Sequence, residues 1–234
     1  MIINSLQKNT LIDYPGKIAC TIFVPGCNFR CGFCHNPELM SLGIGNISEE
    51  ELFGFLKTRR DYLDGVCITG GEPLTILNID FVKKIKDLGY SVKLDTNGSF
   101  PEKLKMFLDR NLIDYVAMDI KSSRSSYFKT TRRVIDLKAV KRSIRMISEL
   151  PEYEFRTTVI PSIHNVEEIA KIRDWLLEVS GKPRLRAYYL QAFVPAMGKM
   201  NDESFEKIKS PSLKMLEAMN EKVKDSFEIC EIRC

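Results

Sequence analysis

A regular alternation of short apolar segments with longer amphipathic ones limits this chain most strongly to one class of fold. Strand-like segments are expected at residues 18–24, 65–69, 91–94, 115–118, 154–160, 186–190 and 227–232. Helix-like segments are expected between them, at residues 48–60, 78–88, 101–110, 136–150, 166–179 and 204–219. Strands separated by helices are typical of βαβ units, so the pattern predicts an α/β protein with a parallel sheet.

Chain length helps to separate the architectures that this pattern allows. A closed barrel of eight such units typically needs about 250 residues, whereas this chain offers six units within 234 residues. The count favours a partial (β/α)6 barrel, with an open doubly wound sheet as the alternative. Because no linker rich in Pro, Gly or Ser interrupts the chain, we expect a single domain over residues 1–234, with a short lead-in at 1–17 and a tail at 220–234.

The composition is that of an ordinary globular protein, with 44% hydrophobic and 28% charged residues. The formal net charge of +4 is too small to indicate a nucleic-acid partner. The N-terminus lacks a basic region followed by an apolar run, and no stretch approaches the roughly 18 apolar residues of a membrane span. We therefore expect a cytoplasmic protein without a membrane partner, in which seven cysteines indicate metal binding or catalysis rather than disulfides.

Three cysteines lie close together directly after the first predicted strand, in a segment that we call the cysteine loop (residues 27–35). Cys27, Cys31 and Cys34 follow the spacing C-x3-C-x2-C and are the candidate metal ligands. A four-iron cluster usually takes four thiolates, so three local ones would leave one iron open to another ligand. Catalytic zinc sites use the same principle when they keep one position for water or substrate.

The residues alone leave other uses of these thiols open. A structural zinc ion could bind the three cysteines together with His35, although two adjacent residues make awkward ligands for one ion. Residues 31–35 also match the c-type haem attachment pattern, which needs export and is therefore not expected here. Cys230 and Cys234 form a further C-x3-C near the C-terminus, but a second cluster would need more ligands.

Polar or cysteine-bearing turns follow four of the predicted strands. They are the cysteine loop, Gly70-Gly71-Glu72, Asp95-Thr96-Asn97 and Asp119-Ile120-Lys121. Ligands of parallel α/β folds gather beyond the carboxyl ends of the strands, so we expect the four turns to converge on one rim. Taken singly, Gly70-Gly71-Glu72 is more typical of a tight turn, and the other two are also compatible with an ordinary turn and a helix cap.

The cysteine spacing and the Gly-Gly-Glu turn together resemble the radical S-adenosylmethionine (SAM) superfamily. The aromatic Phe33 before the last cysteine fits the same cluster loop, and Gly70, Gly71 and Glu72 match the superfamily's SAM-binding turn. The resemblance implies a [4Fe–4S] cluster on the three cysteines, with an open iron that binds the amino and carboxylate groups of SAM. It also implies that one electron from the cluster cleaves SAM into methionine and a 5′-deoxyadenosyl radical.

Five stretches resemble the glycyl-radical-enzyme activases, most of all the anaerobic ribonucleoside-triphosphate reductase activating proteins. They lie at residues 11–17, 34–39, 95–98, 118–121 and 159–161. The resemblance implies that the SAM-derived radical removes hydrogen from a glycine of a large partner enzyme, and that flavodoxin or ferredoxin is the one-electron donor. The 31 residues between Cys34 and Val66 contain no cysteine, which excludes activases with a ferredoxin-like insert.

The pyruvate formate-lyase activating enzymes, a related group, imply roles for further polar residues. Asp95, Thr96 and Asp119 match positions that hold a monovalent cation beside the SAM carboxylate. Carboxylate oxygens suit such a hard cation. Arg156 matches an arginine near the methionyl part of SAM.

Lys121 and His164 complete the candidate cofactor-binding set. Lys121 would approach SAM or the partner, and His164 lies where the family has SAM-contacting polar residues. The neighbouring Asn165 is first a candidate helix cap. Residues 121–133 contain five basic side chains and no acidic one, and such a segment would either dock a partner or form a solvated loop.

Three hypotheses of function follow from the sequence. The first is a radical SAM activase that acts on a glycyl radical enzyme, with anaerobic ribonucleotide reductase favoured over pyruvate formate-lyase. The second keeps the radical chemistry but takes a small molecule, as in 7-carboxy-7-deazaguanine synthases. The third is a non-catalytic metal-binding or electron-transfer protein.

Overall fold

A computed structural model of the protein describes residues 1–43 and 45–234. These residues pack into two compact units, each of which is described by itself. The first unit comprises residues 1–28, 38–96 and 102–116, and the second comprises residues 29–37, 97–101 and 117–234. The single domain expected for residues 1–234 stays a prediction. No helix in the described part of the chain is long and apolar enough to cross a membrane.

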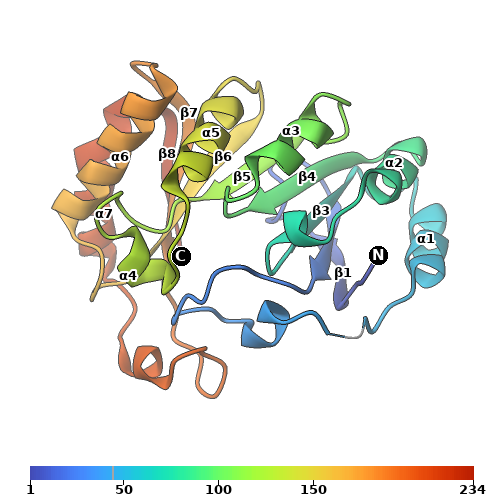
Figure 1. The fold of residues 1–234 in the computed structure, drawn as a ribbon, viewed down its shortest axis with the longest axis horizontal. Helices are drawn as coiled ribbons and strands as arrows, with labels where there is room; N and C mark the ends of the chain where they lie inside the picture. Colours follow the sequence, from blue (N-terminus) through green and yellow to red (C-terminus); the bar gives the residue numbers. More distant parts are fainter. Residues whose placement is uncertain (44) are drawn as a thin grey trace. The chain divides into compact units, whose positions relative to one another are not determined.

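Four strands form the sheet of the first unit (Figure 1). They are β1 (Ser5–Thr10), β2 (Ala19–Val24), β3 (Gly65–Gly70) and β4 (Ser91–Thr96). The last three are parallel, with Val24 paired to Gly70 and Ile68 paired to Leu94. Nearly every side chain of β2 and β3 is at least half-buried. Burial on both faces explains why these strands have continuous apolar runs rather than an alternating pattern.

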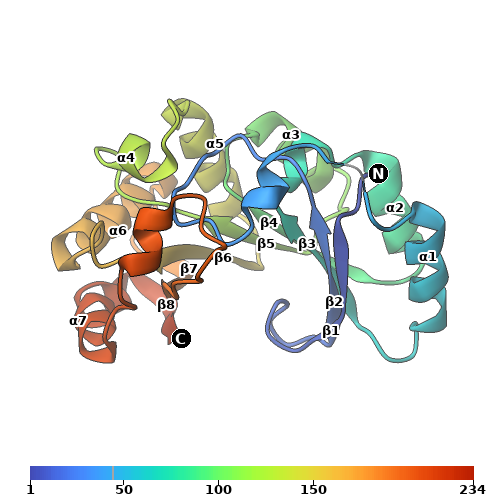
Figure 2. The same ribbon diagram turned by 90° about the horizontal axis from the view of Figure 1, so that it is seen from below.

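The strand β1 escaped the sequence analysis, which assigned its residues to a lead-in. Its side chains are mostly polar and exposed, with Leu6 as the one apolar residue, so no apolar periodicity marks the segment. It runs antiparallel beside β2 (Figure 2), with a register shift between Gln7 and Thr10. Bulges of this kind are common at sheet edges, where backbone pairing rather than side-chain burial holds the strand.

Helices follow the parallel strands along this part of the chain. They are α1 (Glu49–Thr58), α2 (Ile79–Asp87) and α3 (Pro101–Leu108), with short 3-10 segments η1 (Pro37–Met40) and η2 (Pro73–Thr75). The cap predicted at Ser48 is present, because its Oγ accepts a hydrogen bond from the Glu51 N–H at 3.1 Å. An N-cap oxygen of this kind satisfies one of the free N–H groups at a helix start.

The second unit repeats the pattern. Its strands are the end of β5 (Tyr115–Asp119), which begins in the first unit, and β6 (Tyr153–Val159), β7 (Leu185–Ala192) and β8 (Phe227–Arg233). Its helical elements are α4 (Tyr127–Thr131), α5 (Leu137–Ser148), α6 (Val166–Ser180), η3 (Glu203–Lys207), α7 (Leu213–Val223) and η4 (Lys224–Ser226). The strands β6, β7 and β8 are parallel. Figure 1 shows α6 and α7 beside β7 and β8.

The strands follow one another in chain order from β1 to β8. Six helix-containing connections join β2 to β8, so the structure has the six βα units that the sequence predicts. A doubly wound sheet would instead reverse its strand order at an internal point, and the sequential order therefore excludes that alternative. The predicted α/β class with a mostly parallel, sequential sheet is confirmed.

Two local predictions are wrong. The helix expected at 204–219 is split into η3 and α7, because Pro211 cannot continue a helix and Ser212 caps a new one through the Met215 N–H. The basic segment at 121–133 contains the short helix α4, for which no periodic apolar pattern was visible. In the expected tail at 220–234, the structure places the end of α7 and the strand β8.

Candidate active site

The first half of the cysteine loop (residues 27 and 28) belongs to the first unit, where the backbone around it is tightly fixed. The N–H groups of Gly26 and Cys27 donate to the carbonyls of Leu39 and Met40, at 2.8 and 3.1 Å. The Glu72 N–H donates to the Gly26 carbonyl at 2.6 Å. These bonds join the turn after β2 directly to the turn after β3.

Steric crowding explains the two glycines of the Gly-Gly-Glu turn. A Cβ atom on Gly71 would lie 2.7 Å from the Leu39 carbonyl oxygen and closer still to that of Gly26. Gly70 has a φ of +120°, and a Cβ there would lie 2.5 Å from the Val24 nitrogen. Only glycine fits at both positions, because the backbones of neighbouring strand ends approach too closely for a side chain.

The third residue of this turn, Glu72, is fully buried. Its Oε1 accepts hydrogen bonds from the Leu74 N–H at 3.2 Å and from the Thr96 hydroxyl at 2.9 Å. Glu72 therefore caps η2 and also links the end of β3 to the end of β4. Two residues predicted to bind the cofactor, Glu72 and Thr96, are in direct contact.

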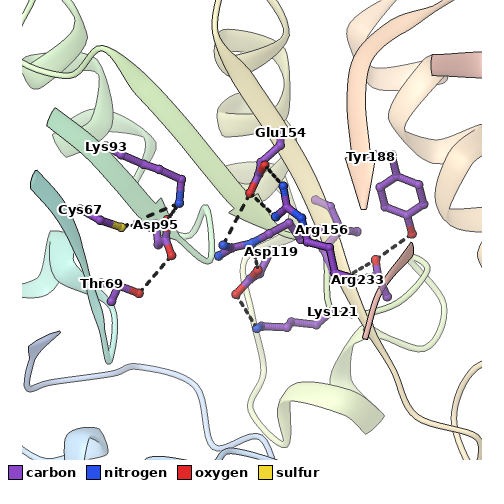
Figure 3. A network of polar contacts seen from close by, with 12 residues as sticks. Cys67, Thr69, Lys93, Asp95, Asp119, Lys121, Glu154, Arg156, Tyr188 and Arg233 are labelled. Carbon is purple, nitrogen blue, oxygen red and sulfur yellow. Dashed lines mark hydrogen bonds and ion pairs between the residues drawn. The ribbon is translucent and has the colours of Figure 1, made fainter. Parts of the chain in front are cut away.

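Asp95 lies in a polar cluster on β3 and β4 that the sequence analysis did not find (Figure 3). Its Oδ1 accepts from the ammonium group of Lys93, and its Oδ2 accepts from the Thr69 hydroxyl at 3.2 Å. The Cys67 thiol lies 3.8 Å from both the Lys93 ammonium and the carboxylate of Asp95. The available signal was a lysine inside a short apolar strand, where a charge needs a partner.

The second half of the cysteine loop (residues 29–35) belongs to the second unit and is held by distant residues. The Arg30 N–H donates to the Thr131 carbonyl at 3.0 Å. The N–H groups of Asn201 and Asp202 donate to the carbonyls of Cys34 and Gly32, at 3.3 and 3.0 Å. The Asn201 side chain adds a bond to the Cys31 carbonyl at 3.2 Å. Neither Asn201 nor Asp202 belongs to a motif that the sequence would single out.

Aromatic packing closes this half of the loop. Phe33 is buried, and its ring centroid lies 6.1 Å from that of Phe205 in η3. The Lys121 ammonium lies over the Phe33 ring, 5.9 Å from its centroid. A Cβ atom on Gly32 would lie 2.5 Å from the Phe205 ring, so a larger residue here would force that ring to shift.

The three thiols fit an iron–sulfur cluster by their chemistry. None of them forms a disulfide, Cys31 is 7% exposed, and Cys27 and Cys34 are half-buried. Among residues 1–43 and 45–234, no three His, Cys, Asp or Glu side chains are gathered to hold a metal ion. Cluster thiolates bind separate irons and do not converge on one point. His35 Nε2 is bonded to the Val194 carbonyl at 2.6 Å, a bond that a metal-binding histidine commonly makes through its other ring nitrogen.

Asp119, at the end of β5, is paired with two cations of the second unit (Figure 3). Its Oδ1 accepts from Arg156 Nε and its Oδ2 from Lys121 Nζ, both at 2.9 Å. Burial by itself would raise the pKa of Asp119, but Arg156 and Lys121 hold that pKa well below its usual value. Burial would likewise lower the pKa of Lys121, and the Asp119 carboxylate raises it. All three groups are therefore charged at neutral pH.

The arginine of this pair takes part in a longer network along β6 and β8. Arg156 Nη1 lies 3.7 Å from Glu154 Oε1, and Arg233 donates to both Glu154 oxygens at 2.9 and 2.7 Å. Glu154 is fully buried, so it balances two guanidinium groups. This network explains how a strand can carry an arginine among apolar residues.

His164 is buried, and both of its ring nitrogens are bonded to backbone. Its Nδ1 accepts from the Ile160 N–H at 3.0 Å, so its Nε2 carries the proton and donates to the Lys121 carbonyl at 3.1 Å. Burial lowers the pKa of His164 to about 4, which keeps the ring neutral at neutral pH. Both ring nitrogens are therefore engaged with backbone, and the expected contact between His164 and SAM stays a prediction. The residue holds the loop after β5.

Residues 21–176 match the family model of the radical SAM superfamily. The chain belongs to this superfamily. It is 30% identical over 241 residues to a Methanocaldococcus jannaschii protein named as a glycyl-radical enzyme activating enzyme, covering 99% of this chain and 95% of that one. It is 28% identical over 229 residues to the pyruvate formate-lyase-activating enzyme of Clostridium pasteurianum, covering 88% and 95%.

A solved structure with a similar fold is that of Streptococcus suis SuiB bound to its precursor peptide SuiA. The TM-score is 0.66 at 17% identity, over 92% of this chain and 48% of that one. At this identity the likeness concerns the fold alone. Together with the family match, the relatives show that this radical SAM protein is an enzyme of the glycyl-radical-enzyme activating kind. Members of the superfamily use a [4Fe–4S] cluster and SAM.

Proposed function

We propose that this radical SAM enzyme generates a glycyl radical on anaerobic ribonucleoside-triphosphate reductase. The observation that carries the proposal is the cysteine loop, which presents three cysteines that form no disulfide on a backbone fixed by hydrogen bonds in both halves. The choice of the reductase rests on the five stretches that resemble its activating proteins. The compact connection from the loop to β3, in which the described residues form the helical elements η1 and α1, supports an activase without an inserted cluster domain.

The bound cluster and SAM would supply the 5′-deoxyadenosyl radical that takes a hydrogen atom from the partner's glycine. The protein's part in this chemistry is to bind the cluster, to orient SAM and to exclude competing reactions. The three cysteines would each bind one iron as a thiolate. Glu72 and Thr96 would orient SAM in the first unit. In the second unit, Lys121 would supply positive charge near the cysteine loop, since its ammonium lies over Phe33, and Arg156 would lie near the methionyl part of SAM. Hydrogen abstraction needs no side-chain acid or base, so no pair of catalytic carboxylates is required.

We place the enzyme in the cytoplasm, where flavodoxin or ferredoxin would donate the electron. No cysteine among the described residues forms a disulfide, as expected in a reducing compartment. The basic segment at 121–133 is a weaker docking surface than its sequence suggests. Three of its cations already form ion pairs, with Asp119, Glu178 and Asp202.

The test is an anaerobic incubation of the reconstituted enzyme with SAM, dithionite and the reductase encoded in the same genome. A glycyl-radical EPR doublet on the reductase is expected, together with release of 5′-deoxyadenosine. The matched controls are Cys31→Ala in the enzyme and a glycine-to-alanine change at the radical site of the reductase. Both should remove the doublet.

Other outcomes would identify the alternatives. Cleavage of SAM with a doublet on pyruvate formate-lyase but none on the reductase would replace the proposed partner. Cleavage of SAM with a doublet on neither protein would point to a small-molecule substrate. A chain that binds iron and sulfide but cleaves no SAM would overturn the enzymatic proposal.

A further inference from the structure

The resemblance to pyruvate formate-lyase activating enzymes implies a monovalent cation at Asp95, Thr96 and Asp119. In the structure, cationic side chains of the protein itself lie on both carboxylates. The Thr96 hydroxyl donates to Glu72 at 2.9 Å. The residues that match the cation positions are therefore present, but their surroundings differ from those that a metal cation needs.

Asp95 is the clearer case. Lys93 is 1% exposed, and its ammonium is bonded to Asp95 Oδ1. The Thr69 hydroxyl donates to Oδ2 at 3.2 Å, so both carboxylate oxygens accept from a protein donor. An ammonium has the single positive charge of Na⁺ or K⁺ and three N–H donors. Lys93 thus supplies at this carboxylate the charge that a bound cation would supply.

The carboxylate of Asp119, in the second unit, is likewise neutralised by the protein's own side chains. Both of its oxygens accept from cations at 2.9 Å, one from Arg156 and one from Lys121. Their side chains are only 12% and 15% exposed, so water screens these charges weakly. An added metal cation would stand next to two positive groups that already neutralise the carboxylate.

Like charges a few ångströms apart repel strongly where solvent is excluded. A Na⁺ or K⁺ ion on Asp95 would lie beside the Lys93 ammonium, which is 1% exposed and has no solvent to receive it. The same repulsion applies at Asp119. The monovalent cation does not fit the charge arrangement of either carboxylate.

We propose that Lys93 takes the place of the monovalent cation at Asp95, and that this enzyme binds SAM without Na⁺ or K⁺. The positive charge that would attract the SAM carboxylate is then built into the chain. The inference rests on membership of the radical SAM superfamily, and it is independent of which partner receives the radical. The cation test can therefore fail while the proposed partner is confirmed, and the partner test can fail while the cation proposal is confirmed.

The first experiment needs no variant. The SAM dissociation constant of the reconstituted enzyme is measured by equilibrium dialysis in tetramethylammonium chloride, and again in NaCl and KCl at equal ionic strength. We expect the three values to agree within about threefold. A larger tightening by either metal ion would overturn the proposal.

The second experiment uses Lys93→Met, which leaves Asp95 without its ammonium. This variant should acquire a cation requirement, so that its melting temperature and its SAM affinity both rise with KCl relative to tetramethylammonium chloride. Lys93→Arg keeps the charge and should stay independent of the salt. Lys86→Met is the matched control, because it breaks an ion pair with Asp114 elsewhere in the same unit.

The outcomes remain decisive if Lys93→Met folds poorly. Recovery of folding by KCl, but not by the organic salt, would support the proposal. If KCl restores neither stability nor SAM binding to a folded Lys93→Met, then Lys93 does not stand in for a cation. If the variant is unfolded in every salt, the measurement on the wild type decides.

Discussion

The two halves of the cysteine loop are held by different means. Cys27 is fixed by backbone bonds to residues 39 and 40, and by close packing of Gly71 against the Gly26 carbonyl. The half with Cys31 and Cys34 is fixed by segments far along the chain, at residues 131, 201 and 202. The comparison teaches that one cluster loop combines a rigid, sterically determined part with a part that depends on long-range hydrogen bonds.

The largest effect is expected from crowding the rigid half. Gly71→Ala would place a Cβ against two carbonyl oxygens, with 2.7 Å to that of Leu39. We expect a loss of more than about 3 kcal/mol in the free energy of unfolding and loss of cluster binding. Denaturant titration and iron analysis measure both. Gly54→Ala, a helical position with open space around it, should be neutral or stabilising by about 1 kcal/mol.

Acid should weaken the second unit through His164. The unfolded chain protonates a histidine near pH 6.5, whereas the folded protein does so only near pH 4. Because the pKa of His164 is lower in the folded protein, the neutral ring stabilises the folded state fully above pH 6.5, and this stabilisation is lost as the pH falls towards 4. The free energy of unfolding should drop by about 2 kcal/mol more in the wild type than in His164→Gln between pH 7 and pH 5. Equal slopes for the two proteins would contradict this account.

Loosening the second half should have a smaller effect. Asn201→Ala removes side-chain bonds to the carbonyls of Arg30 and Cys31, at 3.4 and 3.2 Å. We expect a loss of about 1 kcal/mol in stability and faster iron release to a chelator. Asn46→Ala removes a similar bond to the Asn4 carbonyl at 3.1 Å and should leave iron release unchanged. If the wild type and Asn201→Ala released iron at equal rates, the 201–202 segment would not hold the cysteine loop in place.

The smallest change concerns charge near the loop rather than its backbone. Lys121→Gln removes the ammonium that lies over Phe33 and leaves the negative charge of Asp119. A less positive surrounding disfavours the reduced cluster, so its midpoint potential should fall by about 50 mV. An EPR-monitored redox titration measures it, with the exposed Lys129→Gln as control. An unchanged potential would show that Lys121 acts only as a partner of Asp119.

Local signals account for the parts of the fold that the sequence predicts well. Ser48, Asn78 and Asn165 cap their helices through bonds to residues three positions on, so the information lies within one turn. The strands buried on both faces are visible as apolar runs. The polar edge strand β1 and the short α4 lack such a signal, because tertiary pairing rather than their own composition stabilises them.

The residues of the candidate site also fall into those that the sequence reveals and those that only the structure reveals. The three thiols, the Gly-Gly-Glu turn and the strand-end aspartates could be found from spacing, since each lies within a few residues of a strand end. Lys93, Asn201 and Asp202 could not, although each contacts a predicted residue or its backbone. His164 could be singled out from the sequence, but the bonds of both its ring nitrogens to backbone could not.

By itself, the sequence determined the alternation of strands and helices, the three candidate ligands and the polar residues at strand ends. These features depend on side-chain type and short spacing alone. Only the tertiary structure decided which charges face one another. Arg156 reaches Asp119 across 37 residues of sequence, and Lys93 meets Asp95 on the same strand next to Thr69 of another. Such pairs arise from strand register and packing. The resemblance to pyruvate formate-lyase activating enzymes implied a metal cation at Asp95 and Asp119, and only the structure revealed that side-chain cations of the protein lie on both carboxylates.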